Sequence, residues 1–206
     1  GDRKGLDKII QPYDYFCDYP WFYRDLYKYL DKATVYFEYG SGGSTYQASI
    51  RDNIKKIYSV ESDKEWHNKI KENIGDLSKI NFLYNEMDTR PNTWGYPGPN
   101  STKEQWINYS NQLLKLSSIQ QKEIDLVMID GRFRVACCLK CFNVVDDNCI
   151  IIFDDFLNRK QYHSVLQFYD IIEKTNDNQM VILKKKKDIL SIPIELIQKY
   201  ELEKRC

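Results

Sequence analysis

The stretch Phe37-Glu38-Tyr39-Gly40-Ser41-Gly42-Gly43-Ser44-Thr45 follows an apolar, β-prone run at 33–37 and precedes a helix-compatible segment at 46–50. A second β-prone run at 57–60 ends on Glu61. The order is therefore strand, glycine turn, helix, strand and acid, with the acid about 20 residues after the first glycine. This pattern predicts a βαβ unit in which the glycines let the backbone approach a ligand and the acid binds a ribose diol.

The residues around the turn discriminate between kinds of nucleotide. A dinucleotide site favours a third small residue where Thr45 stands, and a carboxylate such as Glu38 is a poor neighbour for a pyrophosphate. The same carboxylate suits a ligand with a positively charged amino group. S-adenosylmethionine has an amino group, a sulfonium and a ribose but no phosphate, so the turn favours this cofactor over a dinucleotide.

The glycine turn and Glu61 resemble motifs of the class I S-adenosylmethionine-dependent methyltransferases, a resemblance that covers residues 33–184. It implies that Asp88, after the third predicted strand, lies near the adenine amino group, with Glu86 and Asn85 as alternatives. The residues implied in cofactor binding are Glu38, Gly40, Ser41, Gly42, Ser44, Thr45, Glu61, Asp88 and Asp130, and Gly43 is expected to aid close backbone approach.

The composition is that of one globular domain. Of the 206 residues, 42% are hydrophobic and 29% are charged, which is enough apolar material for a sizeable core. We expect a single methyltransferase domain over 1–206, with a helical lead-in at 1–32, the cofactor-binding core at 33–184 and an extension at 185–206. Lys plus Arg and Asp plus Glu balance at 30 each, so no bulk positive field favours nucleic acid as a partner.

No run of the sequence is long and apolar enough for a transmembrane helix, and no charged-then-apolar signal peptide opens it. We therefore expect no membrane partner and a cytoplasmic location, in the host cell if the protein is viral. The cysteine spacing fits neither a disulfide framework nor a zinc site. Buried apolar cysteines in a reducing compartment are expected; they are Cys17, Cys137, Cys138, Cys141, Cys149 and Cys206.

Strand-like and helix-like segments alternate along the chain. Strands are expected at 33–37, 57–60, 80–84, 124–129, 149–153 and 180–183, and helices at 20–31, 46–50, after 62, 103–116, 133–145 and 159–173, with a terminal helix or tail at 192–204. The alternation predicts an α/β fold that is Rossmann-like and doubly wound, with a mostly parallel sheet. Ligands of such sheets bind at the carboxyl ends of the strands, where the acids of this chain also fall.

Three acids follow the fourth and fifth predicted strands: Asp130, Asp154 and Asp155. Clustered carboxylates suit a hard cation such as Mg²⁺, which could bind two substrate hydroxyls and lower the pKa of one. The layout is similar to metal-dependent small-molecule O-methyltransferases, including those that act on catechols, but Gly-Arg-Phe-Arg replaces their usual residues after Asp130. Without a metal, Asp154 or Asp155 would act as general base or orient His163.

The chain has two histidines. His163 follows Asp155 closely and is a candidate to take a hydroxyl proton, since imidazole titrates near physiological pH. His67 falls on the helix after Glu61 and is expected at the surface. The catalytic candidates are Asp130, Asp154, Asp155 and His163.

Arginines and aromatic rings are the expected substrate contacts. Arg132 and Arg134 could hold an anionic acceptor such as a nucleotide sugar, or pair with the nearby aspartates. The long irregular segment 88–101 is typical of a binding loop, and its aromatic rings suit stacking on a sugar. The expected substrate-binding residues are Arg132, Arg134, Trp94, Tyr96 and Tyr162.

The acceptor atom is expected to be a hydroxyl oxygen, because no Asn-Pro-Pro-Tyr type motif of base methylation follows the fourth strand. Residues 129–136, with Asp-Asp-Phe and Tyr-His downstream, look like bacterial and large-virus proteins of glycan synthesis. The chain is similar to chlorovirus methyltransferases that act on rhamnose of capsid glycans. This resemblance implies a glycan or nucleotide-sugar acceptor, with a homodimer or a longer glycosyltransferase chain as the setting.

Three alternatives remain open from the sequence. One is a catechol-type, metal-dependent O-methyltransferase that acts on a small molecule. The second is a dehydrogenase-like nucleotide-binding protein, against which Glu38 and the missing third glycine count. The third is a cofactor-binding partner subunit without catalysis, against which the retained acids and His163 count.

Overall fold

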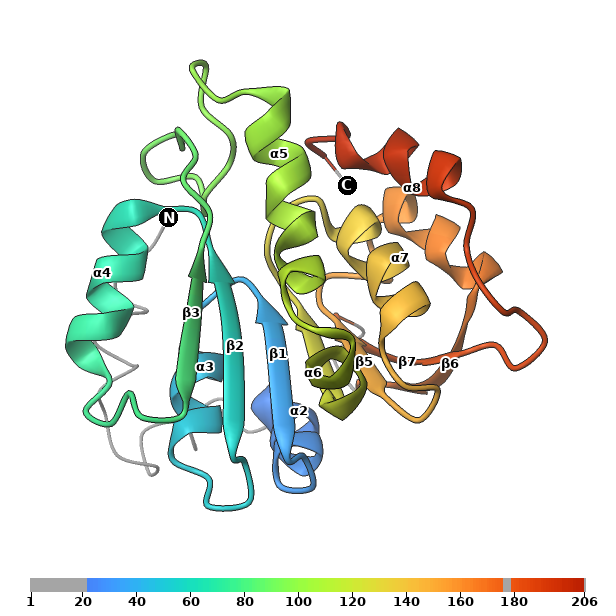
Figure 1. Ribbon diagram of the computed structural model, residues 1–206, viewed down its shortest axis with the longest axis horizontal. Helices are drawn as coiled ribbons and strands as arrows, with labels where there is room; N and C mark the ends of the chain where they lie inside the picture. Colours follow the sequence, from blue (N-terminus) through green and yellow to red (C-terminus); the bar gives the residue numbers. More distant parts are fainter. Residues whose placement is uncertain (1–21, 176–178, 206) are drawn as a thin grey trace.

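A seven-stranded sheet forms the centre of the computed structural model, which describes residues 22–175 and 179–205 (Figure 1). The strand order is β3-β2-β1-β4-β5-β7-β6. The strands are β1 (Val35–Tyr39), β2 (Lys56–Glu61), β3 (Ile80–Tyr84), β4 (Leu126–Ile129), β5 (Ile150–Phe153), β6 (Tyr169–Lys174) and β7 (Val181–Lys185). Strands β1 to β5 are parallel, whereas β7 pairs antiparallel with both β5 and β6. The predicted doubly wound, mostly parallel α/β fold is confirmed.

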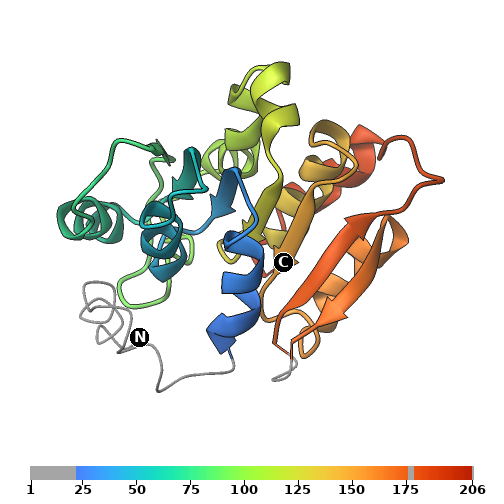
Figure 2. The same cartoon turned by 90° about the horizontal axis from the view of Figure 1, so that it is seen from below.

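Helices cover both faces of the sheet, as Figures 1 and 2 show together. The α-helices are α2 (Phe22–Leu30), α3 (Gly43–Ser49), α4 (Lys64–Asn73), α5 (Lys103–Ser110), α6 (Ser118–Glu123), α7 (Arg134–Val144) and α8 (Ile194–Glu201). The 3₁₀ segments are η2 (Asn111–Lys115) and η3 (Lys160–Gln167). Helices α5, α7 and α8 contact one another over one face, and α2 contacts α3 over the other.

Alternation along β1 divides the core between these two faces. Val35, Phe37 and Tyr39 join the cluster under α7, while Tyr36 joins the cluster under α2 and α3. All five residues of β1 are buried. Because successive side chains of a strand point to opposite faces, Glu38 lies on the same side as Tyr36. The side of the sheet on which Glu38 lies determines which residues its carboxylate can contact.

The predicted helix at 159–173 is wrong. Residues 159–173 form η3 and then strand β6, rather than a continuous helix. Residues of β6 alternate between less and more exposed, since successive side chains of a strand point to opposite faces, and among the described strands β6 lies at the edge and pairs with β7 alone. The predicted helix at 103–116 is shorter, since α5 passes into η2 at Asn111.

Other local predictions hold. The helix predicted after residue 62 is α4, and Asp63 caps it by accepting a hydrogen bond from the Trp66 N–H. The segment 192–204, predicted as a terminal helix or tail, forms helix α8. Four cysteines are buried and free, namely Cys137, Cys138, Cys141 and Cys149; Cys17 and Cys206 lie outside the described residues, as do the first 21 residues of the predicted lead-in. Within the described ranges, no helix is long and apolar enough to cross a bilayer.

Candidate active site at the carboxyl edge of the sheet

The glycine turn after β1 packs against the residues after β4. Gly40 has a φ of 98°, and a Cβ there would lie 2.9 Å from the carbonyl oxygen of Asp130. Gly131 is equally close, since its Cβ would lie 3.1 Å from the Gly40 nitrogen. No atom lies within 4 Å of a Cβ built on Gly42 or Gly43. The turn is therefore tight toward β4 and open on its other side.

Glu38 is the centre of a buried hydroxyl network rather than a ligand-facing group. Its carboxylate is fully buried and accepts hydrogen bonds from Ser44 Oγ (2.6 Å), Ser59 Oγ (2.6 Å), Tyr36 OH (2.8 Å) and Thr45 Oγ1. Burial raises its pKa, and the hydroxyl donors oppose that shift.

In the structure Glu38, Ser44 and Thr45 contact one another through this network, and their predicted contact with the cofactor stays a prediction. Strand parity turns Glu38 under α3, where the two hydroxyls of that helix meet it. The three residues hold the turn in shape and leave its open side to Ser41 and the glycines. Thr45 Oγ1 also accepts a hydrogen bond from the Gly42 N–H at 2.9 Å, which ties the turn to α3.

Glu61 lies at the end of β2, beside the turn. One carboxylate oxygen accepts hydrogen bonds from the N–H groups of Ser62 (2.7 Å) and Asp63 (2.9 Å), and the other from Ser41 at 3.3 Å. Burial raises the pKa of Glu61 to about 7, against the effect of these donors. The long Ser41 contact leaves acceptor capacity on Oε2, so Glu61 is able to receive hydroxyl donors from a ligand.

The loop at 88–101 reaches over this acid. Its base is closed by Asp88, whose carbonyl accepts the Gly98 N–H (2.7 Å) and whose carboxylate accepts the Asn100 N–H (2.8 Å). A Cβ on Gly95, near the loop tip, would lie 3.9 Å from Oε1 of Glu61. Asp88 thus closes the base of the loop, and its predicted place near the adenine amino group stays a prediction. The alternative Asn85 is buried and bonds Asn108 and Gln112, while Glu86 is exposed.

The three aspartates after β4 and β5 are joined by one arginine. Arg134, buried in the first turn of α7, lies 3.1 Å from Asp130 Oδ1 and 3.9 Å from Asp155 Oδ2. Its guanidinium also donates to the carbonyls of Gly131 (3.0 Å) and Asp154 (2.9 Å). Burial, then the charge of Asp130 and a hydrogen bond to it, raise the pKa of Asp154 well above its usual range.

This arrangement does not fit the predicted divalent cation. The guanidinium of Arg134 already stands between Asp130 and Asp155 as their counter-charge. Asp155, held at a φ of 57°, turns away to a 2.7 Å ion pair with Arg159. Across the described residues, no three His, Cys, Asp or Glu side chains are grouped to hold a metal ion. The structure supports the alternative weighed for Arg134, pairing with the nearby aspartates.

The two histidines differ from expectation. His163 stacks on Phe156, with ring centroids 5.0 Å apart, and its Nε2 lies 3.1 Å from the Phe156 carbonyl oxygen. His67 is buried rather than at the surface, stacked on Tyr84 and edge-on to Phe82. Both rings therefore serve packing in this structure, and within the described residues His163 makes no hydrogen bond to the aspartates.

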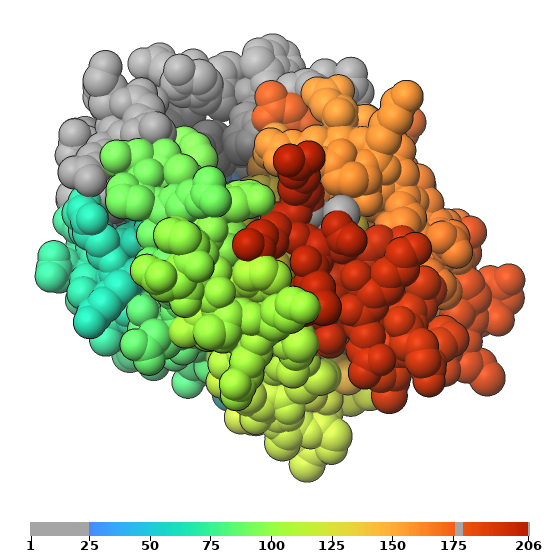
Figure 3. Space-filling view, turned by 90° about the horizontal axis from the view of Figure 1, so that it is seen from above, coloured from blue at the N-terminus to red at the C-terminus, as the bar shows by residue number. Residues whose placement is uncertain are grey.

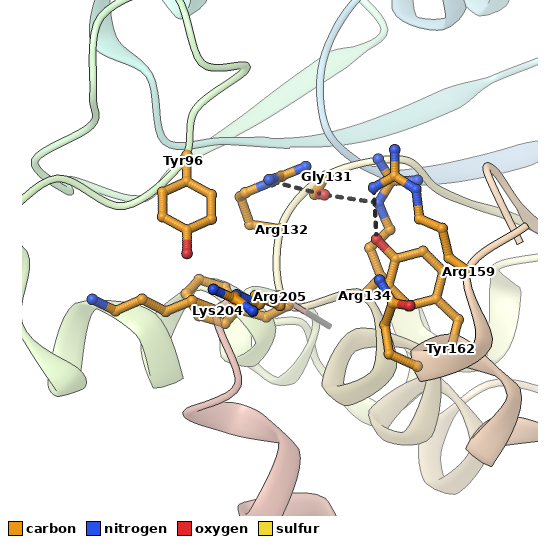
Figure 4. Close-up of a pocket in the computed structure, with 10 residues that line it drawn as sticks. Tyr96, Gly131, Arg132, Arg134, Arg159, Tyr162, Lys204 and Arg205 are labelled. Atoms are coloured by element: carbon orange, nitrogen blue, oxygen red, sulfur yellow. Dashed lines mark hydrogen bonds between the residues drawn. The ribbon is translucent and has the colours of Figure 1, made fainter.

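A pocket of about 220 Å³ opens beside Asp130 (Figure 4). It is lined by Tyr96, Gly131, Arg132, Phe133, Arg134, Arg159, Gln161, Tyr162, Lys204 and Arg205. Of the predicted substrate residues, the structure gathers Tyr96, Tyr162 and both arginines here, whereas Trp94 is 73% exposed and lies outside the lining. Figure 3 looks onto this edge of the molecule, where the C-terminal segment lies beside the α5 region.

Three cationic residues of the pocket escaped the sequence analysis. Arg159 had a local signal, because it follows Asp155 by four residues and forms an ion pair with it. Lys204 and Arg205 had none, since only tertiary packing brings the end of the chain back to α5. There Lys204 Nζ lies 4.0 Å from the centre of the Trp106 ring.

Comparison with known proteins supports the fold. Neither a protein-family model nor a curated protein matches the sequence. Among solved structures, a methyltransferase-like protein from Silicibacter pomeroyi aligns with a TM-score of 0.73 and 23% identity, over 86% of this chain and 92% of its own. An O-methyltransferase from Bacillus cereus in complex with SAH aligns with a TM-score of 0.54 and 9% identity, over 90% and 92%.

A tRNA methyltransferase from Bacillus subtilis also aligns, with a TM-score of 0.50 and 12% identity, over 79% of this chain and 64% of its own. These similarities establish a methyltransferase-type, Rossmann-like fold. They span proteins named for different acceptors, so the fold does not select one.

Proposed function

We propose that this protein is an S-adenosylmethionine-dependent O-methyltransferase acting on a sugar hydroxyl of a glycan. The observation that carries the proposal is the glycine turn wedged against Asp130, with the buried acceptor Glu61 beside it. The turn, the acid and the residue after β4 meet at the edge where parallel sheets bind ligands. The structural neighbours with methyltransferase names agree with this assignment.

The residues fit the cofactor in two ways. Space beside Gly42 and Gly43 leaves the outer side of the turn open to a ligand. Glu61, buried and with spare acceptor capacity, suits the two hydroxyls of a ribose. Ser41 and Asp130 flank the same space, and Glu38 supports it from beneath. When bound, S-adenosylmethionine supplies a methyl group already activated by its sulfonium.

Among the four catalytic candidates, Asp130 is best placed to take the hydroxyl proton. Its side chain is 45% exposed and pairs with Arg134, while its backbone carbonyl packs against Gly40 of the turn. Asp154 is 7% exposed, and its raised pKa favours the protonated form at neutral pH, so it is a poor base. Asp155 and His163 act as positioning residues, the first on Arg159 and the second on the backbone after β5.

The acceptor side favours a sugar over a catechol. A catechol enzyme of the metal-dependent kind needs carboxylates free to coordinate a cation, and here Arg134 and Arg159 engage two of them. Tyr96, half-buried at the pocket, offers an aromatic ring of the kind that packs against a sugar, whereas Tyr162 is 2% exposed and lies under the guanidinium groups of Arg134 and Arg159. A glycan sugar such as rhamnose therefore remains the preferred acceptor.

Calorimetric titration with S-adenosylhomocysteine, with NAD as control, tests the proposal. We expect binding of S-adenosylhomocysteine alone, with Glu61→Gln weakening it. Transfer of a labelled methyl group to rhamnose-containing glycans then tests the acceptor. Binding of NAD, or of neither ligand, would overturn the cofactor assignment, and transfer to catechol but to no glycan would overturn the acceptor.

A further inference from the structure

The pocket beside Asp130 is lined by five cationic side chains and by no acidic one. Two of the cations are neutralised: Arg134 pairs with Asp130, and Arg159 pairs with Asp155. Arg132, Lys204 and Arg205 make no ion pair with any described residue. The pocket therefore holds an excess of positive charge, although the chain as a whole is neutral.

The positions of these cations concentrate their charge. In Figure 4, Tyr96, Arg132, Lys204 and Arg205 lie on one side, with Arg134, Arg159 and Tyr162 on the other. Among the described residues, the guanidinium of Arg132 donates only to its neighbour, the Gly131 carbonyl, at 3.2 Å through Nε. Burial, and then the charge of Arg134, lower the pKa of Arg132. A bound anion would offset both the loss of hydration of Arg132 and its repulsion by Arg134.

The backbone at the start of helix α7 adds to the positive potential of the pocket. Helix α7 starts at the pocket wall, and its N-cap residue, Phe133, is in the left-handed conformation with φ 51° and makes no side-chain cap. An uncapped helix start presents N–H groups and a partial positive charge, which favour anions. The 11-residue helix thus points its positive end at the space between the cationic side chains.

From this arrangement we infer that the pocket binds a phosphate or diphosphate group carried by the acceptor. The identity of the acceptor in this inference rests on the proposed function, whereas the binding of an anion by the pocket does not. Arginine forks match phosphate oxygens with paired hydrogen bonds. The volume of about 220 Å³ corresponds to several waters and is smaller than a site for a whole drug-sized ligand. It fits an ionic group, with the sugar outside it.

The pocket adjoins the place of methyl transfer. Gly131 is part of its lining and also packs on Gly40, so the anion subsite and the glycine turn share one wall. A sugar linked to a phosphate held here would place its ring between the pocket and Asp130. The acceptor class is therefore a sugar phosphodiester or diphosphate, linked either to a nucleoside or to a lipid.

Titration of the full chain with inorganic pyrophosphate tests this inference without any methyl transfer. We expect saturable binding that weakens at least about fivefold in Arg132→Gln and in Lys204→Gln, since each removes a charge-assisted contact. Lys69→Gln is the matched control, because Lys69 lies on α4 and pairs only with Glu65. Absence of binding, or equal affinity in all variants, would overturn the phosphate subsite.

Further probes identify the carrier of the phosphate. UDP binding tighter than pyrophosphate supports a nucleotide-linked acceptor, and geranyl diphosphate binding tighter supports a lipid-linked one. Glucuronate binding as tightly as pyrophosphate would overturn the assignment to phosphate in favour of a carboxylate. A parallel titration with S-adenosylhomocysteine keeps the two proposals separate, since its failure alongside pyrophosphate binding would overturn only the methyltransferase function.

Discussion

The carbonyl oxygen of Asp130 lies so close to Gly40 that a Cβ on that glycine would be 2.9 Å away. Real Cβ atoms do not approach backbone oxygens this closely, and the φ of 98° at Gly40 is itself unfavourable for any other residue. The contact couples the turn that follows β1 to the acid that follows β4. The two halves of the proposed site are therefore set by one backbone contact.

Gly40→Ala is expected to destabilise the fold by about 1–3 kcal/mol, because it combines backbone strain with a clash against backbone atoms. It should also weaken S-adenosylhomocysteine binding. Urea denaturation and calorimetry measure the two effects. Gly75→Ala, between α4 and β3 and away from the turn, is the control, since no atom lies within 4 Å of a Cβ built there; it should be neutral or stabilising by about 0.4–1 kcal/mol. Equal losses in both variants would contradict the packing argument.

Cofactor affinity should depend on pH through Glu61. Its pKa of about 7 in the ligand-free fold exceeds the usual value, so a proton must leave before the carboxylate accepts ribose hydroxyls. The dissociation constant for S-adenosylhomocysteine should fall by about tenfold per pH unit as pH rises from about 5 to about 7, and then level off.

The raised pKa of Glu61 also makes the stability of the folded protein depend on pH. The ligand-free folded state holds the Glu61 proton at pH values where the unfolded chain has lost it. Stability from this group is therefore full below the unfolded pKa of about 4.3 and declines up to about 7. Glu61→Gln should lack both pH dependences. A wild-type affinity profile that matches that of Glu61→Gln would contradict the assignment.

Arg134→Met should destabilise the protein by about 1–3 kcal/mol, because the half-exposed Asp130 loses its ion-pair partner, whereas Asp155 keeps Arg159. It also removes the donors to the carbonyls of Gly131 and Asp154. Lys69→Met, which breaks the exposed pair with Glu65, should change stability by less than about 0.5 kcal/mol. Denaturant midpoints at constant slope give both values, and a small effect at Arg134 would show that its ion pairs contribute little.

Asp130→Asn should lower the turnover number by about 10²–10⁴-fold while leaving S-adenosylhomocysteine affinity nearly unchanged, as expected for a general base. Asp170→Asn, on the exposed side of edge strand β6, is the matched control and should retain full activity. Single-turnover assays with the identified acceptor separate chemistry from binding. Retained turnover in Asp130→Asn would move the base to another of the candidates.

Methyl transfer should survive EDTA. The reason is the position of Arg134, whose guanidinium already neutralises the carboxylates that a divalent cation would need. The measurement compares initial rates in EDTA with rates after Mg²⁺ is restored. Loss of activity in EDTA that Mg²⁺ recovers would show that the aspartates rearrange to bind a metal.

The sequence predicted the local parts of the site and missed the parts that packing decides. Gly40 and Glu61 were recognisable because a turn and a strand end are determined by neighbouring residues. The contacts of Glu38 were not predicted, because they depend on the face of the sheet to which its side chain points, which lies beneath α3. Residues 159–173 were predicted as one helix, yet their second half pairs with β7 as strand β6, a pairing that depends on the rest of the sheet.

The anion subsite marks the limit of sequence reasoning most clearly. Arg132 and Arg134 were identifiable from their place after Asp130, but whether each is paired or free depends on where Asp155 turns. Lys204 and Arg205 reach the pocket only through the packing of α8 on α5 and α7. No spacing rule connects residues so distant in the chain.

The return of the chain's last described residues to the pocket has a consequence for biosynthesis. The turn after β1 and the acid after β2 leave the ribosome early, and the five parallel strands can assemble before β7 and α8 are made. Lys204 and Arg205 are made after all of these elements, so the proposed cofactor side of the site forms before the proposed acceptor side is complete. A nascent chain would then acquire its ability to hold the activated donor well before its ability to choose what receives the methyl group.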